Sequence, residues 1–76
     1  MARLPILQAQ DVIEVLEKPG FQVIRQGGSH GRLRHQDARM VTVPVHPGQD
    51  ISRGLVRKIL RDAEITPIEF LEELNV

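Results

Sequence analysis

The segment from Arg25 to Arg34 (RQGGSHGRLR) combines the residue types needed for chemistry on a phosphodiester backbone. Glycine lets the backbone approach a ligand closely, and the imidazole of His30 exchanges a proton near neutral pH. The guanidinium groups of Arg25, Arg32 and Arg34 attract phosphate. The pattern therefore indicates a site for a nucleic acid. Judged on local sequence alone, such a segment is more commonly a plain hairpin turn followed by a solvated basic strand.

Two strands are expected to position this segment, one over residues 21–26 and one over residues 29–35, with a turn at Gly27-Gly28. Leu33 is the strongly apolar member of the second strand. With Leu33 facing the core, alternation along the strand sends Gly31 and His35 the same way. The residues on the opposite, solvated face are then His30, Arg32 and Arg34.

A third strand is expected over Met40–Val45, after a turn at residues 36–39, with its valines on one face. Pro44 donates no hydrogen bond to a neighbouring strand, so this strand should have a free side near its end. Residues 46–50 are expected to form a loop.

Helices are expected before and after the strands along the sequence. Residues 8–18 place four apolar side chains on one helical face, and Pro19-Gly20 ends that helix. A second helix is expected over Arg53–Ala63, capped by Ser52 or Asp50. Its core stripe is Val56, Ile59, Leu60 and Ala63, and the basic residues Arg53, Arg57, Lys58 and Arg61 take its other faces.

A capping box at residues 66–69, with Pro67 at the first helical position, predicts a short acidic helix over Pro67–Leu74. Phe21 and Phe70 are expected in the core. The predicted fold is α+β: a helix, a three-stranded antiparallel sheet and a helix, with a short C-terminal helix and the helices on one face of the sheet.

Size and composition exclude several classes of protein. A chain of 76 residues has room for one domain and one modest core. It has no cysteine, so it holds neither a disulfide nor a thiolate zinc site. We find no pattern of a membrane span or signal peptide and expect a cytoplasmic protein that does not contact membranes. Tyr and Trp are absent, which argues against a single-strand reader that stacks bases on aromatic rings.

The formal net charge of zero conceals a segregation along the chain. Residues 18–61 carry nine basic and two acidic side chains, whereas residues 62–76 carry five acidic and no basic ones. Salt screens charges over about 8 Å, so each segment acts with its local charge. The basic middle therefore indicates a face that binds a polyanion.

Four segments, in order and spacing, resemble the HicA toxins, small ribonucleases of bacterial toxin–antitoxin pairs. They are Gly20-Phe21, Arg25–His30, Val41–His46 and Gly54–Arg61. The resemblance covers about residues 8–66 of a single domain over residues 1–76, with 67–74 as an acidic helical extension. It implies a fold similar to the double-stranded RNA-binding domain, which agrees with the elements expected above.

The resemblance also implies a function. It identifies the chain as an endoribonuclease toxin (an mRNA interferase) that acts on mRNA and is silenced by a HicB-type antitoxin, and it makes His30 the catalytic residue. RNA supplies its own nucleophile, the 2′-hydroxyl, so no metal or cofactor is expected. His30 then accepts the 2′-hydroxyl proton or donates one to the leaving 5′-oxygen, help that contributes about 10²–10⁴-fold.

Several groups are candidates for binding RNA around His30. Arg32 and Arg34 are expected to hold phosphate, with outer contributions from other basic side chains. The backbone amides of the turn add donors to a phosphate oxygen. The outer basic residues are Arg25 and Lys58, and the amides are those of Gly28 and Ser29.

One histidine cannot act as acid and base at once, so a water molecule or a weaker group must fill the second role. His46 is open to that role, although we rank it lower than a turn residue. His35 is expected at a strand end or turn. The spacing of His30, His35 and His46 has no compact ligand pattern, so no metal site is expected.

Two further functions stay open. The same basic face suits a non-catalytic module similar to double-stranded RNA-binding domains, and a degenerate toxin would serve mainly to form a complex. The acidic tail, residues 62–76, is a candidate contact for the partner or a second copy. Cleavage of RNA by the purified chain separates the enzyme from the other two.

Overall fold

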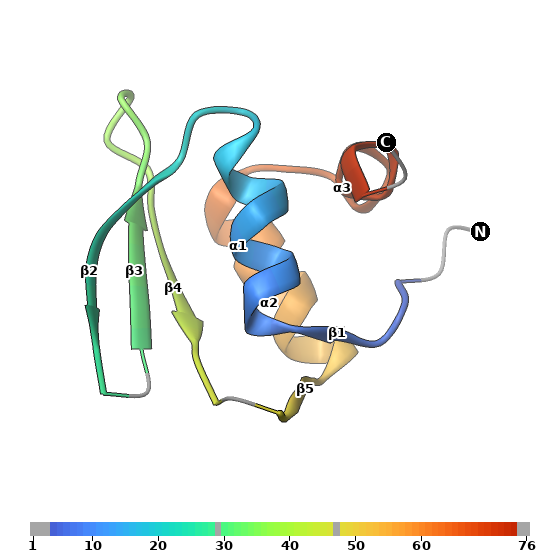
Figure 1. Cartoon of the computed structure of the whole chain (residues 1–76). Coiled ribbons are helices and arrows are strands. Elements are labelled where there is room, and N and C mark those ends of the chain that lie inside the picture. The colour runs from blue at the N-terminus through green and yellow to red at the C-terminus, as the bar shows by residue number, and fades with distance from the viewer. Residues whose placement is uncertain (1–3, 29, 47, 75–76) are drawn as a thin grey trace.

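The computed structural model describes residues 4–28, 30–46 and 48–74 and arranges them as a sheet layer against a helix layer (Figure 1). The elements are β1 (Leu7–Gln8), α1 (Ala9–Glu17), β2 (Gln22–Gly27), β3 (His30–Arg34), β4 (Met40–Pro44), β5 (Asp50–Ile51), α2 (Arg53–Ala63) and α3 (Pro67–Leu74). Strands β2, β3 and β4 form an antiparallel sheet in that order. This is the predicted α+β fold, with the arrangement of the double-stranded RNA-binding domain.

A second, two-stranded sheet was not predicted. β1 pairs antiparallel with β5, so that Leu7 lies opposite Ile51 and Gln8 opposite Asp50. The expected loop over residues 46–50 was therefore wrong at Asp50, and Pro47 lies outside the described residues. Strands of two residues are too short to show a period of two, and their pairing joins distant parts of the chain. Local pattern therefore gives no sign of this ladder.

Helices α1 and α2 bury the predicted apolar stripes against one face of the sheet. In α1 the buried side chains include Val12, Ile13, Val15 and Leu16, and in α2 they are Val56, Ile59, Leu60 and Ala63. Ser52, one of the two cap candidates, accepts a hydrogen bond at its Oγ from the Leu55 amide at 3.2 Å. Both helices begin where the sequence placed them to within one residue.

The inner face of the sheet carries alternate residues of β3 and β4. Leu33, Val41 and Val43 are buried there beneath the helices. Gly31 shares this face, and a Cβ at that position would lie 3.3 Å from Val45 Cγ2 and 3.6 Å from Ile13 Cδ1. Its missing side chain therefore lets α1 approach β3 closely, directly behind the strand that carries His30.

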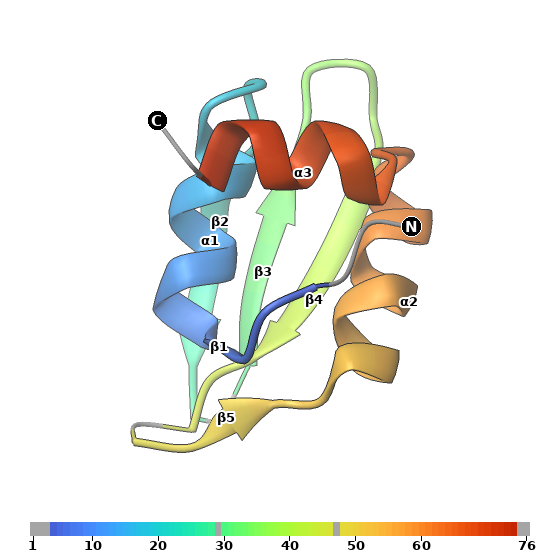
Figure 2. The ribbon, with the colours of Figure 1, turned by 90° about the vertical axis from the view of Figure 1, so that its right-hand side faces the viewer.

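Helix α3 crosses the helix layer and contacts α1 and α2 (Figure 2). The capping box is formed, because Thr66 Oγ1 accepts from the Glu69 amide at 3.1 Å while Glu69 Oε1 accepts from the Thr66 amide at 3.2 Å. Phe70 is fully buried, as predicted, and Leu4 enters the same core from the other end of the described chain. The acidic helix is therefore packed into the core of the domain.

Replacing Phe70 tests whether α3 stabilises the whole domain. We expect Phe70→Ala to lower the free energy of unfolding by about 3–5 kcal/mol, because it leaves a cavity among α1, α2 and α3. Ile68→Ala is the matched control, since Ile68 is 61% exposed on the same helix. It should change that free energy by less than about 0.5 kcal/mol. Urea unfolding measures both, and equal effects would contradict the packing of α3.

Candidate active site

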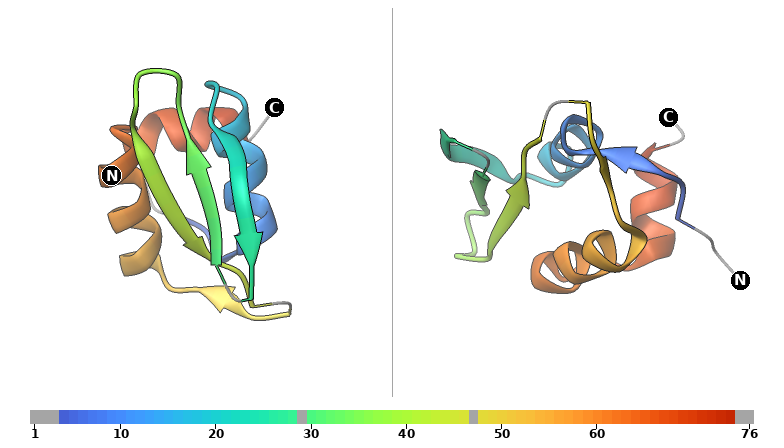
Figure 3. Two further views of the ribbon diagram at one scale, coloured as in Figure 1. Left: turned by 90° about the vertical axis from the view of Figure 1, so that its left-hand side faces the viewer. Right: turned by 90° about the horizontal axis from the view of Figure 1, so that it is seen from below.

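The outer face of the three-stranded sheet is open. Figure 3 shows this face in front with α1 and α2 behind it, and in the described residues no helix covers it. His30, Arg32 and Arg34 of β3 are exposed, while the intervening Gly31 and Leu33 are buried. The predicted alternation along β3 is therefore confirmed. It places an imidazole and two guanidinium groups on the face turned toward solvent.

A β-bulge in β2 adds Arg25 to this face. Val23 lies opposite Leu33 and Arg25 lies opposite Arg32, so Ile24 is an extra residue between the two pairs. Regular alternation would have placed Arg25 with Val23 on the other face of the sheet. Because opposed residues of neighbouring strands share a face, the bulge turns Arg25 outward beside Arg32.

Five residues line an open hollow of about 330 Å³ on this face. It is lined by Arg25, Gly27, His30, Arg32 and Thr42. None of these described lining residues is acidic. The pairing explains the grouping. Arg25, Arg32 and Thr42 form one row across the sheet, and Gly27, His30 and Pro44 form the next row on the same face.

Arg25 and Arg32 directly oppose one another across two strands. Like charges in this position destabilise a sheet. The arrangement therefore costs folding free energy that a bound anion between the guanidinium groups would offset. The opposed pair is therefore a candidate for binding a phosphate.

The turn that presents His30 lies one residue later than predicted. Gly27 pairs with His30, so the connection begins at Gly28. Gly28 has a φ of +61°, a left-handed conformation that glycine adopts without steric cost. Ser29, expected to contribute an amide, lies outside the described residues.

Two predicted phosphate-binding residues lie away from this hollow. Arg34 lines a neighbouring hollow on the same sheet face, at the end near Gly20. Lys58 belongs to α2 in the helix layer, and its Nζ is 3.0 Å from Oδ2 of Asp62. The structure thus brings Arg25 and Arg32 to His30, keeps Arg34 close by on the same strand, and leaves Lys58 behind the sheet.

Sequence analysis missed two of the residues that line this hollow, Thr42 and Gly27. A polar residue between Val41 and Val43 is a visible sign of a solvated strand face. Its relation to His30 depends on the register of β4 against β3, where Thr42 lies opposite Arg32. The hydroxyl offers one more hydrogen-bond donor to a phosphate or ribose oxygen.

The other two histidines lie outside the hollow. His46 lines a separate hollow of about 180 Å³ with Gln8, Ala9, Gln10 and Val45. His35 follows β3 and is a turn residue, as predicted. Its Nε2 lies 3.0 Å from the carbonyl oxygen of Pro19, and its ring meets the Phe21 ring edge-on at 5.1 Å.

Arg39 fastens the turn after β3 to the helix layer. Its Nε donates to both carboxylate oxygens of Asp37, at 2.9 and 2.8 Å, and its Nη1 donates to the carbonyl of Ala63 at the end of α2. The guanidinium carbon also lies 5.2 Å from the centre of the Phe21 ring. Hydrogen bonds from Arg39 hold the pKa of Asp37 below its usual value of 3.8.

Comparison with known proteins gives the family. A family model described as the HicA toxin of bacterial toxin–antitoxin matches residues 9–65. The chain belongs to the HicA toxin family. The match contains every lining residue of the hollow around His30, and it ends before α3. A search of curated proteins finds no match for this HicA toxin.

Family membership makes this chain a toxin of a toxin–antitoxin pair and implies an antitoxin partner. No helix within the described ranges is long and apolar enough to cross a membrane. In the same ranges, no three His, Cys, Asp or Glu side chains gather as a metal-binding cluster.

Removing the Asp37 carboxylate tests the link through Arg39. Because the folded pKa of Asp37 is lowered, its ionised form contributes stability above the unfolded pKa, near 3.8, and this is lost as pH falls through the folded pKa. Asp37→Asn should therefore lower the free energy of unfolding at neutral pH, and the difference from the wild type should shrink in acid. Urea unfolding across that pH range measures it. Glu72→Gln, an exposed change on α3, is the control, and a difference independent of pH would contradict the assignment.

Proposed function

We propose that this HicA toxin is a metal-independent endoribonuclease that cleaves mRNA, with His30 as its general acid or base. The observation that supports this proposal is the shared hollow on the open sheet face. One imidazole and two guanidinium groups line it, and none of its described lining residues carries a competing negative charge. Those are the groups that transesterification of a ribose-phosphate chain requires.

In the reaction, the 2′-oxygen of the substrate attacks the adjacent phosphorus and the bond from phosphorus to the 5′-oxygen breaks. The products are a 2′,3′-cyclic phosphate and a 5′-hydroxyl. Neutral His30 accepts the 2′-hydroxyl proton, or protonated His30 donates a proton to the departing 5′-oxygen. A water molecule carries the other proton, since His46 lines a different hollow.

The phosphoryl oxygens gain negative charge as the 2′-oxygen attacks. Arg25 and Arg32, which oppose one another beside His30, stabilise that charge through charge-assisted hydrogen bonds. Thr42 adds a hydroxyl donor, and the amide of Gly28 adds a backbone donor at the turn; a contribution from the Ser29 amide stays a prediction. Relief of the repulsion between Arg25 and Arg32 on binding favours the anionic substrate over the empty site.

The antitoxin in this proposal is a HicB-type protein that covers the outer sheet face. Complementary charge favours an acidic or RNA-like surface on that partner, because the face presents Arg25, Arg32 and Arg34. The proposed location is the cytoplasm, where mRNA is available. The alternative is a non-catalytic RNA-binding module that uses the same arginines without cleaving the chain.

Replacing His30 separates the enzyme from the binding module. His30→Ala should lower the cleavage rate by about 10²–10⁴-fold and leave RNA affinity within a few-fold of the wild type, because the arginines remain. The matched control is His46→Ala, which removes an exposed imidazole from outside the hollow and should keep full activity. Cleavage of a labelled RNA by antitoxin-free protein measures both. If the wild type cleaves none of several varied RNAs, the proposed enzymatic function is overturned and the non-catalytic RNA-binding module is favoured.

The substrate and a chelator test the chemistry itself. A 2′-deoxy substitution at the scissile nucleotide should abolish cleavage there, because the nucleophile is missing. EDTA should leave the rate unchanged. Products that carry a 5′-phosphate, or activity lost with the chelator, would contradict transesterification assisted by His30.

The arginines of the hollow can be compared with the lysine behind the sheet. Arg32→Ala should weaken RNA binding by roughly 10- to 100-fold, the effect of losing a hydrogen bond to a charged group. Lys58→Ala should change affinity little, because α2 lies on the other side of the sheet from the hollow. Filter binding at a fixed salt concentration measures both constants. Equal losses would show that RNA also reaches the helix layer.

A further inference from the structure

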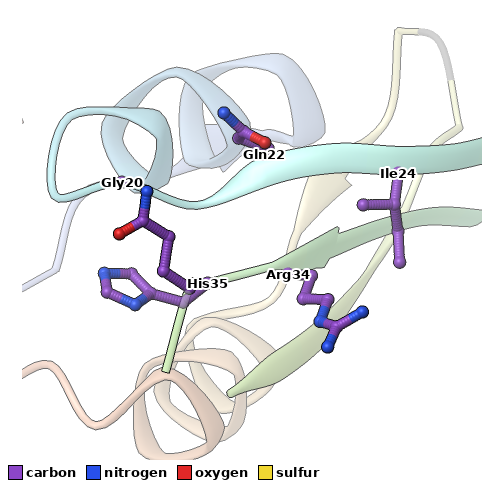
Figure 4. A pocket seen from close by; sticks show the side chains of 6 residues that line it. Gly20, Gln22, Ile24, Arg34 and His35 are labelled. Atoms are coloured by element: carbon purple, nitrogen blue, oxygen red, sulfur yellow. The ribbon is translucent and has the colours of Figure 1, made fainter. Parts of the chain in front are cut away.

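A second hollow lies beside the first on the same sheet face. It has a volume of about 340 Å³ and is lined by Gly20, Gln22, Ile24, Arg34, His35 and Gln36. In Figure 4, Ile24 and Arg34 extend from neighbouring strands, and the His35 ring lies at the end near Gly20. The function proposed above uses Arg34 only as part of the charged face that the antitoxin covers, and it leaves the rest of this hollow unassigned.

Strand β3 joins the two hollows. Arg32 lines the first and Arg34 the second, and both point outward. Two residues along a strand span about 6.6 Å, so a chain bound at Arg32 reaches Arg34 with its next unit. In the row of the sheet that contains Arg34, Gln22 lies on one side of it and Met40 on the other.

The groups in the second hollow suit a nucleobase. Gln22 and Gln36 carry amides that both donate and accept hydrogen bonds, as the edge of a base does. Ile24 is 51% exposed and offers an apolar surface for the flat face of the ring. The planar guanidinium of Arg34 stacks on a base or binds its phosphate. None of the described lining residues is acidic, and the neighbouring carboxylate of Asp37 is paired with His35 at 3.1 Å and with Arg39 at 2.8 Å.

The bulge in β2 contributes to both hollows. It inserts Ile24 between the pairs Val23–Leu33 and Arg25–Arg32, so that neighbouring residues line neighbouring hollows. An apolar isoleucine exposed on this face has no role in the packing of the core. Its exposure in a hollow that two amides and a guanidinium also line is explained if a ligand with an apolar face and polar edges covers it.

We propose that this second hollow is a nucleotide subsite, which receives the base next to the scissile phosphate and gives the toxin a sequence preference. The inference rests on the proposed ribonuclease function and adds its substrate class. The substrate is single-stranded RNA, because a base must leave its pairing partner before its edge can meet Gln22 and Gln36.

Cleavage of a randomised single-stranded RNA tests the subsite. The double variant Gln22→Ala/Gln36→Ala should lose roughly tenfold of the discrimination at the nucleotide beside the cleaved bond, because amide contacts read the base edge. The matched control is Gln10→Ala/Gln49→Ala, which removes two exposed glutamines from outside the second hollow. An unchanged preference in the first double variant would overturn the subsite.

Binding without cleavage separates this inference from the proposed function. NMR titration of the His30→Ala protein with a short oligoribonucleotide should shift the side-chain amide signals of Gln22 and Gln36. Shifts confined to Arg25, Arg32 and Thr42 would overturn the subsite even if the wild type cleaves RNA. If the wild type never cleaves RNA but the signals of both glutamines shift, the proposed ribonuclease function is overturned and the nucleotide subsite stands.

Discussion

The register of β2 and β4 against β3 is the constraint on which the candidate site depends. Opposed residues of neighbouring strands share a face, so the pairs Arg25–Arg32 and Arg32–Thr42 bring three side chains into one row beside His30. A slip of one residue in any pair would turn these side chains to the opposite face. The site is therefore a consequence of strand pairing.

Burial of the inner face fixes the register of β4 against β3. Leu33, Val41 and Val43 pack beneath α1 and α2, and Gly31 leaves room for Ile13 behind the strand. Burying a large apolar side chain contributes about 1.5–3 kcal/mol, so a slipped register would expose several such groups at once. The free energy gained by this packing outweighs the repulsion between Arg25 and Arg32. Like charges in opposed positions disfavour a sheet, and in the proposed function a bound phosphate offsets this repulsion.

The open sheet face and helix α3 carry charges of opposite sign. The open sheet face carries Arg25, Arg32 and Arg34, whereas the acidic helix α3 packs across the far side of the helix layer (Figure 2). A net charge of zero thus coexists with a basic sheet face that attracts anions and an acidic helix on the far side of the molecule. Because Phe70 anchors α3 in the core, this separation of charge is held by the fold.

Periodicity along the chain determined most of the fold and half of the site. Alternation around Leu33 and the helical spacing of Val56, Ile59 and Leu60 are local patterns, so they predicted the outward turn of His30 and Arg32 and the bounds of α2. The short β1–β5 ladder, the bulge at Ile24 and the place of Thr42 required the tertiary structure, because each depends on which distant residues pair. A sequence specifies how side chains alternate within one strand, but only the hydrogen-bonded register between strands decides which of them meet.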